Sequence, residues 1–244
     1  MKRGLIIADR HHKVKEPLHP AYQLVKSFAK EWKPDFVVDI GDTLDLDYFS
    51  EFSREKVSVL ADCDWEDEVD FLNRELDDWQ EYTKEYIWDE GNHDYRARVI
   101  GERVPAFKKT LDYVRRFHLK DRGIKFHLIT DDSPGKIGKL HHTHGWYWNK
   151  YHASKHLDKF SGNIVYGHVH VFQQHSKLLA AQGEEVQAQS IACLCDKQPD
   201  FVKGRPTGWQ HGFAAVYLGD NGNFNLYPVN IIKNSFLFEG REWR

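Results

Sequence analysis

Three short apolar runs alternate with two amphipathic segments at the start of the chain, and this alternation limits the folds that the chain can adopt. The apolar runs are RGLIIAD at 3–9, DFVVDIGD at 35–42 and YIWDEG at 86–91. Between them, 20–32 and 65–86 carry apolar residues at helical spacing. The order strand, helix, strand, helix, strand predicts a sheet with parallel members covered by helices.

Strand signals dominate the remainder of the chain. Helical patterns are expected near 103–118 and 151–160, and short strands near 125–130, 138–143 and 163–168. After these come the strand-like stretches VQAQSIACL, GFAAVYL and NFNLYPVNII, with NG and GN turns between them. The second half therefore predicts a further sheet, largely antiparallel or mixed.

Length and charge narrow the class of protein. At 244 residues and without a Pro/Gly/Ser-rich linker, 1–244 is expected to form one α/β domain. The 34 Lys and Arg residues against 37 Asp and Glu residues argue against a strongly basic DNA-coating surface. The N-terminal apolar run is too short for a signal peptide, and no stretch approaches the roughly 20 apolar residues of a membrane span. We therefore expect a soluble, cytoplasmic protein.

The three cysteines, Cys63, Cys193 and Cys195, suggest neither a disulfide framework nor a zinc finger. Their number is odd, and the close pair reads CLC rather than CxxC. We expect buried or reduced thiols without a role.

Side chains that can bind a metal ion or move a proton follow five of the expected strands. They are Asp9 and His11, Asp42 and Asp45, then Asn92, His93 and Asp94, then His144, and finally His168 and His170. In open α/β sheets the ligand crevice lies at the carboxyl ends of the strands. Residues two apart on an extended segment point to the same side, so the DxH and HxH pairs are each expected to face one site.

Any single one of these motifs is explained at least as well by a turn or a hydrogen-bonded histidine. Other histidines near the motifs, including His12, His141, His142 and His152, are expected to be structural or rim residues. Five motifs in order, each at a strand end, change the balance in favour of a site.

Taken together, the motifs DxH, GDxxD, GNHD, HG and GHxH resemble those of the calcineurin-like metallophosphoesterase superfamily in order and residue type. They span 9–170. In outline the chain is similar to small phage and prophage metallophosphoesterases, with Tyr95, Arg96 and the stretch 209–213 as further points of likeness. The resemblance implies a two-sheet β-sandwich flanked by helices, in four layers α/β/β/α.

The resemblance also implies two divalent metal ions. Asp9, His11, Asp42 and His170 would hold one ion, and Asp42, Asn92, His144 and His168 the other, with Asp42 bridging. The precedent of the family that the chain resembles, together with the absence of cysteine among the ligands, makes manganese the first expectation, with iron, zinc or magnesium behind it.

A phosphate ester would then be hydrolysed by in-line attack of a hydroxide held between the ions. By the same resemblance, His93 protonates the departing alkoxide and Asp45 hydrogen-bonds its ring. A turn cap is the alternative role for Asp45.

Substrate contacts are expected from four further residues. Arg96 and Arg98 can hold phosphate oxygens or be surface arginines on a helix. Trp146 and Trp148 can stack a base or pack against the rim. Arg10, between the first two ligands, meets the substrate or points away.

The substrate expected from these features is a phosphodiester of a nucleotide or nucleic acid. A phosphomonoester of a small molecule or phosphoprotein is the alternative, although Leu46 and Asp47 stand where the protein phosphatases have arginine and glycine. A catalytically silent, metal-binding interaction scaffold is the alternative from another class. Oligomeric state and viral or cellular origin stay open.

Overall fold

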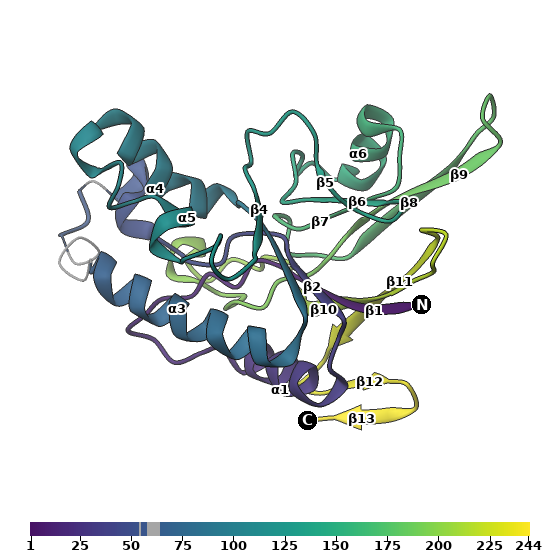
Figure 1. The fold of residues 1–244 in the computed structure, drawn as a ribbon, viewed down its shortest axis with the longest axis horizontal. Coiled ribbons are helices and arrows are strands. Elements are labelled where there is room, and N and C mark those ends of the chain that lie inside the picture. The colour runs from purple at the N-terminus through teal and green to yellow at the C-terminus, as the bar shows by residue number, and fades with distance from the viewer. Residues whose placement is uncertain (54, 58–63) are drawn as a thin grey trace.

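Two large β-sheets face each other in the computed structural model, and helices cover their outer faces (Figure 1). The structure describes residues 1–53, 55–57 and 64–244, so Cys63 lies outside the described residues. The expected four layers, α/β/β/α, are confirmed. No helix within the described ranges is long and apolar enough to cross a membrane.

The first sheet has six strands, of which four adjacent ones are parallel. In spatial order they are β11 (Phe224–Ile231), β10 (His211–Leu218), β1 (Lys2–Ile7), β2 (Phe36–Asp39), β3 (Glu85–Asp89) and β4 (Lys125–His127). The strands β1 to β4 pair in parallel, as the alternating pattern predicts. The crossover helices are α1 (Pro20–Trp32) and α3 (Trp65–Tyr82).

The second sheet has five strands and is mixed. In spatial order they are β5 (Gly135–Ile137), β6 (Leu140–Thr143), β7 (Ile164–Tyr166), β9 (Glu184–Ser190) and β8 (Gln173–Leu179). The expectation that all the late strands build this sheet is wrong, because β10 and β11 join the free edge of β1 in the first sheet, antiparallel. A separate hairpin, β12 (Phe236–Phe238) with β13 (Arg241–Trp243), ends the chain.

Apolar side chains form three layers of core. Along β1, Leu5 and Ile7 face the cluster shared with α1 and α3, whereas Ile6 and Ala8 face the cluster between the two sheets. A third cluster, around Leu157, lies between the second sheet and α6 (His152–Phe160). The central strands β2 and β7 are therefore buried on both faces, whereas the edge strand β8 has no buried residue.

The expected helix near 103–118 is displaced. Helix α4 (Asn92–Arg103) begins directly after β3, and only the short segments η3 (Pro105–Phe107) and α5 (Tyr113–Arg116) follow. Asp94 accepts a hydrogen bond from the backbone N–H of Gly91 at 3.0 Å and so caps the first turn. Because α4 is mostly polar, its sequence lacks the apolar spacing by which a helix is recognised. Three further short turns, η1 (Asp47–Phe49), η2 (Glu51–Ser53) and η4 (Asp200–Val202), lie in loops.

Candidate metal centre

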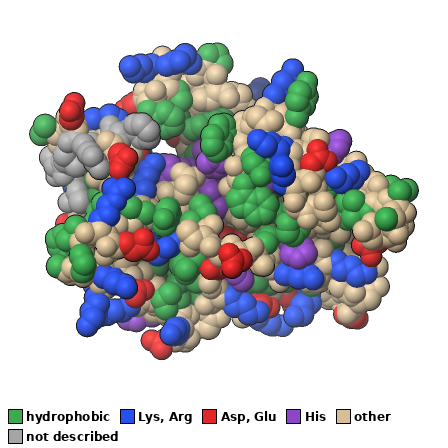
Figure 2. Space-filling view, turned by 90° about the horizontal axis from the view of Figure 1, so that it is seen from above, with side chains coloured by type: hydrophobic (Ala, Val, Ile, Leu, Met, Phe, Trp, Pro, Cys, Tyr) green, Lys and Arg blue, Asp and Glu red, His purple; other side chains and the backbone are tan. Residues whose placement is uncertain are grey.

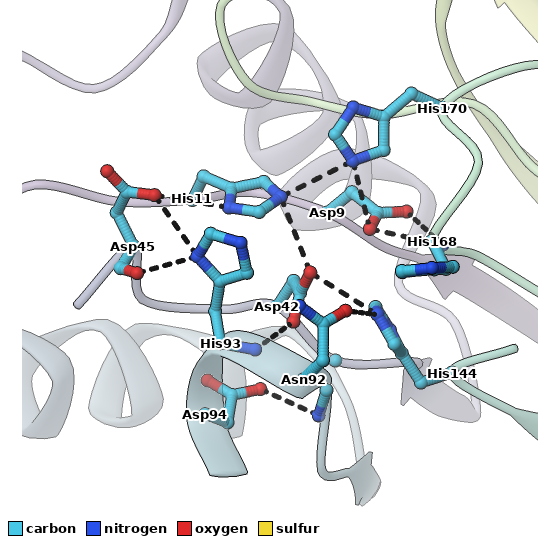
Figure 3. A network of polar contacts seen from close by, with 12 residues as sticks. Asp9, His11, Asp42, Asp45, Asn92, His93, Asp94, His144, His168 and His170 are labelled. Carbon is cyan, nitrogen blue, oxygen red and sulfur yellow. Dashed lines mark hydrogen bonds and ion pairs between the residues drawn. The ribbon is translucent and has the colours of Figure 1, made fainter. Parts of the chain in front are cut away.

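The seven expected metal ligands converge where strands of both sheets end (Figure 3). Asp9 and His11 follow β1, Asp42 follows β2, Asn92 follows β3, His144 follows β6, and His168 and His170 follow β7. The space-filling view shows histidine side chains gathered at a hollow in this face (Figure 2). The two sheets thus place their carboxyl edges around one polar cluster.

The backbone at this cluster is left-handed, not extended as the DxH and HxH spacing suggests. Asp9, His11 and Asp42 have φ of 51°, 43° and 52°, and His168 and His170 have 70° and 59°. Non-glycine residues rarely adopt such angles, and runs of them concentrate at functional sites. Backbone bonds from Asp9 N to Gly41 O at 3.0 Å and from His11 N to Asp42 O at 2.9 Å tie the first two loops together.

Two glycines make room for the buried carboxylates. A Cβ at Gly91 would lie 2.2 Å from Asp42 Oδ1, and a Cβ at Gly167 would lie 2.7 Å from Asp9 Oδ2. Neither distance is tolerable for a side chain, so the loops can approach this closely only with glycine at both positions.

On one side of the cluster, His170 and His11 face the carboxylates of Asp9 and Asp42. His170 Nε2 lies 3.3 Å from Asp9 Oδ1, and His11 Nε2 lies 3.6 Å from Asp42 Oδ2. The two Nε2 atoms of His11 and His170 are 3.3 Å apart. Four ligating atoms from β1, β2 and β7 therefore surround one small volume.

On the other side, His144 faces Asp42 and Asn92. Its Nε2 lies 3.3 Å from Asp42 Oδ2 and 3.0 Å from Asn92 Oδ1. The opposite ring nitrogen donates to the carbonyl of Ile40 at 2.8 Å, which leaves Nε2 free of its proton when the ring is neutral. The His168 ring lies 5.1 Å from the His144 ring, between centroids.

The carboxylates and imidazoles stabilise each other's charged forms. Burial alone would raise the pKa of Asp42, but the charges of His144 and His93 hold it well below 3.8. Burial would lower the pKa of His144, yet the facing Asp42 raises it to about 10; Asp9 does the same for His170, also to about 10. Burial and the charge of His144 lower the pKa of His168 to about 4. The His144 and His170 rings therefore favour the protonated form beside ionised carboxylates, and a divalent cation bound there would replace those protons.

His93 lies beside the cluster and contacts both Asp45 and Arg96. Its Nδ1 is 2.6 Å from the Asp45 carbonyl oxygen and 3.2 Å from Asp45 Oδ1. Because the carbonyl only accepts, Nδ1 carries the proton, and Nε2 accepts from Arg96 at 3.0 Å. Burial opposes a charge on the ring, but Asp42 and the hydrogen bond to Asp45 raise the pKa of His93.

Asp94, the last residue of GNHD, is fully buried beneath the cluster. It accepts bonds from the backbone of Thr43 and Leu44 as well as Gly91, and so joins the second and third loops. Burial and the nearby charge of Asp42 raise the pKa of Asp94 to about 7. The motif position alone gives no sign of this linking role.

Two expected substrate residues are directed elsewhere. The Arg98 guanidinium donates to Glu90 and Glu102, neither of which belongs to the ligand cluster. The Trp146 ring stacks on His156 with 5.6 Å between centroids. Neither contacts the cluster in the described structure.

Trp148 and Arg96, by contrast, lie at the cluster. The Trp148 side chain is 77% exposed, and its ring centroid is 5.9 Å from that of His168. Arg96 donates to the Asp45 carbonyl at 2.9 Å as well as to His93. One side chain thus offers an aromatic face and the other a guanidinium at the rim.

Four other residues can now be placed. Arg10 points away from the cluster into the core, where it pairs with Asp39. Phe213 is core, and the Trp209 ring packs on His170 with 4.1 Å between centroids. Cys195, expected to have no role, has its sulfur within 4.8 Å of ligating atoms of His11 and His170. Nothing in the CLC pattern indicates that proximity.

All five motifs lie at strand ends of a two-sheet α/β fold, and their side chains form one connected cluster. Two facing sheets, helices on their outer faces and motif side chains at the strand ends are the arrangement that the resemblance implies.

Comparisons with known proteins find only distant structural likenesses. No protein-family model matches the chain, and no curated protein matches it in sequence. A Vps29 variant from Entamoeba histolytica is 11% identical with a TM-score of 0.46, covering 96% of each chain. Vacuolar protein sorting 29 from Cryptosporidium parvum is 14% identical with a TM-score of 0.47, covering 99% of this chain and 94% of that one. A dimetal phosphatase from Danio rerio is 12% identical with a TM-score of 0.44, covering 90% and 93%. At these identities and scores the likenesses carry no information on substrate or activity.

One surface cavity formed by described residues lies away from the cluster. It has a volume of about 620 Å³ and includes Arg3, Asp35 and Lys84, at the amino ends of β1, β2 and β3. The chemistry-bearing side chains gather at the opposite, carboxyl edge, where ligands of α/β sheets bind.

Proposed function

We propose that the protein is a two-metal-dependent phosphoesterase that hydrolyses phosphodiesters of nucleotides or nucleic acid. The position of Asp42 carries this proposal. Its Oδ2 lies 3.3 Å from His144 Nε2 and 3.6 Å from His11 Nε2, so one carboxylate faces both halves of the ligand set. A shared carboxylate is needed where two ions lie close together, and is unnecessary for a single closed structural ion.

The donor set fits two divalent ions. Each half offers oxygen and imidazole ligands, which suit Mn²⁺, Fe²⁺ or Zn²⁺, and Mn²⁺ is our first choice. His11 and His170 present Nε2 atoms to each other at 3.3 Å, so one of them must carry a proton unless a cation lies between them. When bound, the ions would polarise the phosphoryl oxygens and lower the pKa of a coordinated water.

His93 supplies the proton to the leaving oxygen in this proposal. The raised pKa of its ring favours the protonated form, and the bonds to Asp45 orient the ring. In the structure, Arg96 donates a hydrogen bond to His93 Nε2. A bound phosphate would attract the Arg96 guanidinium away from the ring. His93 Nε2 could then carry the proton that is transferred to the leaving oxygen. Asp45 and Arg96 are therefore assigned to positioning, and His93 to catalysis.

Replacing His93 with glutamine tests the acid role. A dinucleotide releases an alkoxide, which needs a proton, whereas bis-p-nitrophenyl phosphate releases a phenolate that leaves readily without one. We expect His93→Gln to lower kcat for thymidylyl-thymidine by about 10²–10⁴-fold, and for the p-nitrophenyl diester by much less. The measurement is steady-state hydrolysis with added Mn²⁺, together with metal content, which should match the wild type.

His118→Gln is the matched control, because the His118 side chain is 62% exposed and outside the cluster. An equal loss on both diesters would mean that His93 positions groups rather than donating a proton. No loss on the dinucleotide would remove His93 from the mechanism.

The exposed ring of Trp148 is the observation that favours nucleotides as the substrate class. Its exposed ring beside His168 is placed to stack on a base whose phosphodiester enters the cluster. We expect Trp148→Ala to raise KM for a dinucleotide by between about fivefold and a hundredfold, and to leave KM for an abasic analogue unchanged. Tyr227→Ala, which removes a 46% exposed aromatic ring on β11, is the control. Equal effects on the base-bearing and abasic compounds would contradict base stacking.

A further inference from the structure

A second group of potential metal ligands lies between the two sheets, one step inside their carboxyl edge. Asp89 ends β3 and His127 ends β4, and the two are register partners in the parallel pair. Asp89 lies on the same face of β3 as Ile87, which packs in the inter-sheet core. From the second sheet, His142 lies on the same face of β6 as Leu140, in the same core layer. An apolar layer thus ends in a carboxylate and two imidazoles.

The three side chains are close together and two of them are almost inaccessible. His142 Nδ1 lies 2.7 Å from Asp89 Oδ2, and the rings of His127 and His142 are 5.4 Å apart between centroids. One ligating atom from each residue falls within 4.8 Å of the other two. Asp89 is 3% exposed, His142 is 0% exposed, and His127 is half-buried.

Two polar atoms of this group are buried without a hydrogen-bond partner. They are Asp89 Oδ1 and His142 Nε2. Leaving a buried donor or acceptor unsatisfied costs free energy, so such atoms call for a ligand, an ion or a water. Asp89 and His142 are therefore buried as core residues are, yet each keeps one polar atom without a hydrogen-bond partner.

There is space for an occupant. A cavity of about 20 Å³ is lined by the three side chains together with residues of the 128–134 loop. That volume accommodates one ion or one water. Gly135 keeps the space beside His142 open, since a Cβ there would lie 2.0 Å from the imidazole carbon Cε1.

We propose that Asp89, His127 and His142 form a third metal site, which shares no residue with the candidate centre and binds one divalent transition ion such as Zn²⁺. Two imidazoles and a carboxylate are a common ligand set for Zn²⁺, completed by water or another group. Ligands on a tetrahedral Zn²⁺ lie roughly 3.3 Å apart. The 2.7 Å contact between His142 Nδ1 and Asp89 Oδ2 would therefore open slightly to admit the ion, and one ligating atom of His127 already lies within 4.8 Å of both side chains. The bound ion cross-links β3 and β4 of the first sheet to β6 of the second.

Metal stoichiometry tests the third site. The protein is equilibrated with Zn²⁺ and then dialysed, and bound zinc is measured by mass spectrometry for the wild type, His127→Ala and His141→Ala. His141 is the matched control, because it neighbours His142 but packs against Phe160 on the opposite face of β6. We expect three zinc ions per chain in the wild type and in His141→Ala, and two in His127→Ala.

A second measurement separates this site from the proposed function. In an Asp42→Asn background, Co²⁺ is expected to give a visible absorption band of a nitrogen- and oxygen-ligated site, and Zn²⁺ to raise Tm. Adding His127→Ala removes both effects. If the candidate centre holds no metal, the wild type still binds one zinc ion that His127→Ala loses. Equal zinc content in the wild type and His127→Ala, with no band that depends on His127, would overturn the third site. His127→Gln repeats the test should His127→Ala fold poorly.

Discussion

Asp42→Asn is expected to abolish phosphodiester hydrolysis, lowering turnover by about 10³-fold or more. Asparagine keeps the size of the side chain, tolerates the φ of 52° at this position, and can retain the 2.8 Å bond from the His93 backbone N–H. It removes the single negative charge that faces His11 and His144 together. Both halves of the ligand set lose their shared ligand, so metal affinity falls at both.

The measurement pairs turnover of bis-p-nitrophenyl phosphate with metal content after dialysis against Mn²⁺. The wild type should retain two ions in this cluster and Asp42→Asn fewer. Asp121→Asn, at an 87% exposed carboxylate, is the control for loss of one charge. Full activity and metal content in Asp42→Asn would rule out a bridging carboxylate. A wild type that binds both ions and cleaves neither diester would favour the interaction scaffold.

Arg10→Met is expected to lower the free energy of unfolding by about 3–5 kcal/mol. The Arg10 side chain is 1% exposed, and its guanidinium pairs with the fully buried Asp39. It also donates to Thr43 Oγ1 at 3.1 Å and to the Tyr22 hydroxyl at 3.1 Å. Methionine fills similar space but leaves the Asp39 carboxylate without its countercharge inside the core.

Urea unfolding followed by circular dichroism measures this loss. The double variant Arg10→Met with Asp39→Leu should recover most of the lost free energy of unfolding, because it leaves no unpaired charge buried in the core. Arg103→Met is the control: its ion pair with Glu51 is 55% and 63% exposed, so less than about 1 kcal/mol is expected. A small effect of Arg10→Met, comparable to Arg103→Met, would show that the buried pair does not support the fold.

The parallel part of the first sheet follows from short-range patterns. The helix expected over 20–32 has those bounds in α1, since a proline at its first position and seven buried residues on one face specify it locally. Apolar runs likewise locate β1, β2 and β3 to within a few residues. Each is buried on both faces, so a continuous apolar run is sufficient to recognise it.

The errors occur where local pattern carries little information. Helix α4 has few apolar residues, so no apolar periodicity in the sequence marks it. The hydrogen bond from the Gly91 backbone N–H to Asp94 caps its start at Asn92. The DxH and HxH pairs are left-handed because loops from both sheets meet there and hold them by backbone bonds. The sequence pattern of β10 would be the same in either sheet, so it does not predict which sheet the strand joins. In the structure, β10 pairs with the free edge of β1.

Motif order and residue type predict which side chains lie at the strand ends, because each motif is a short stretch directly after a strand. The motifs do not predict which of these side chains contact one another, because those contacts depend on how the two sheets pack. That packing brings His144 to Asp42, directs Arg98 to Glu90 and buries Arg10. It also joins Asp89, His127 and His142, three residues that no shared motif connects. Contacts between residues distant in sequence depend on how whole sheets pack, and spacing along the chain does not encode that.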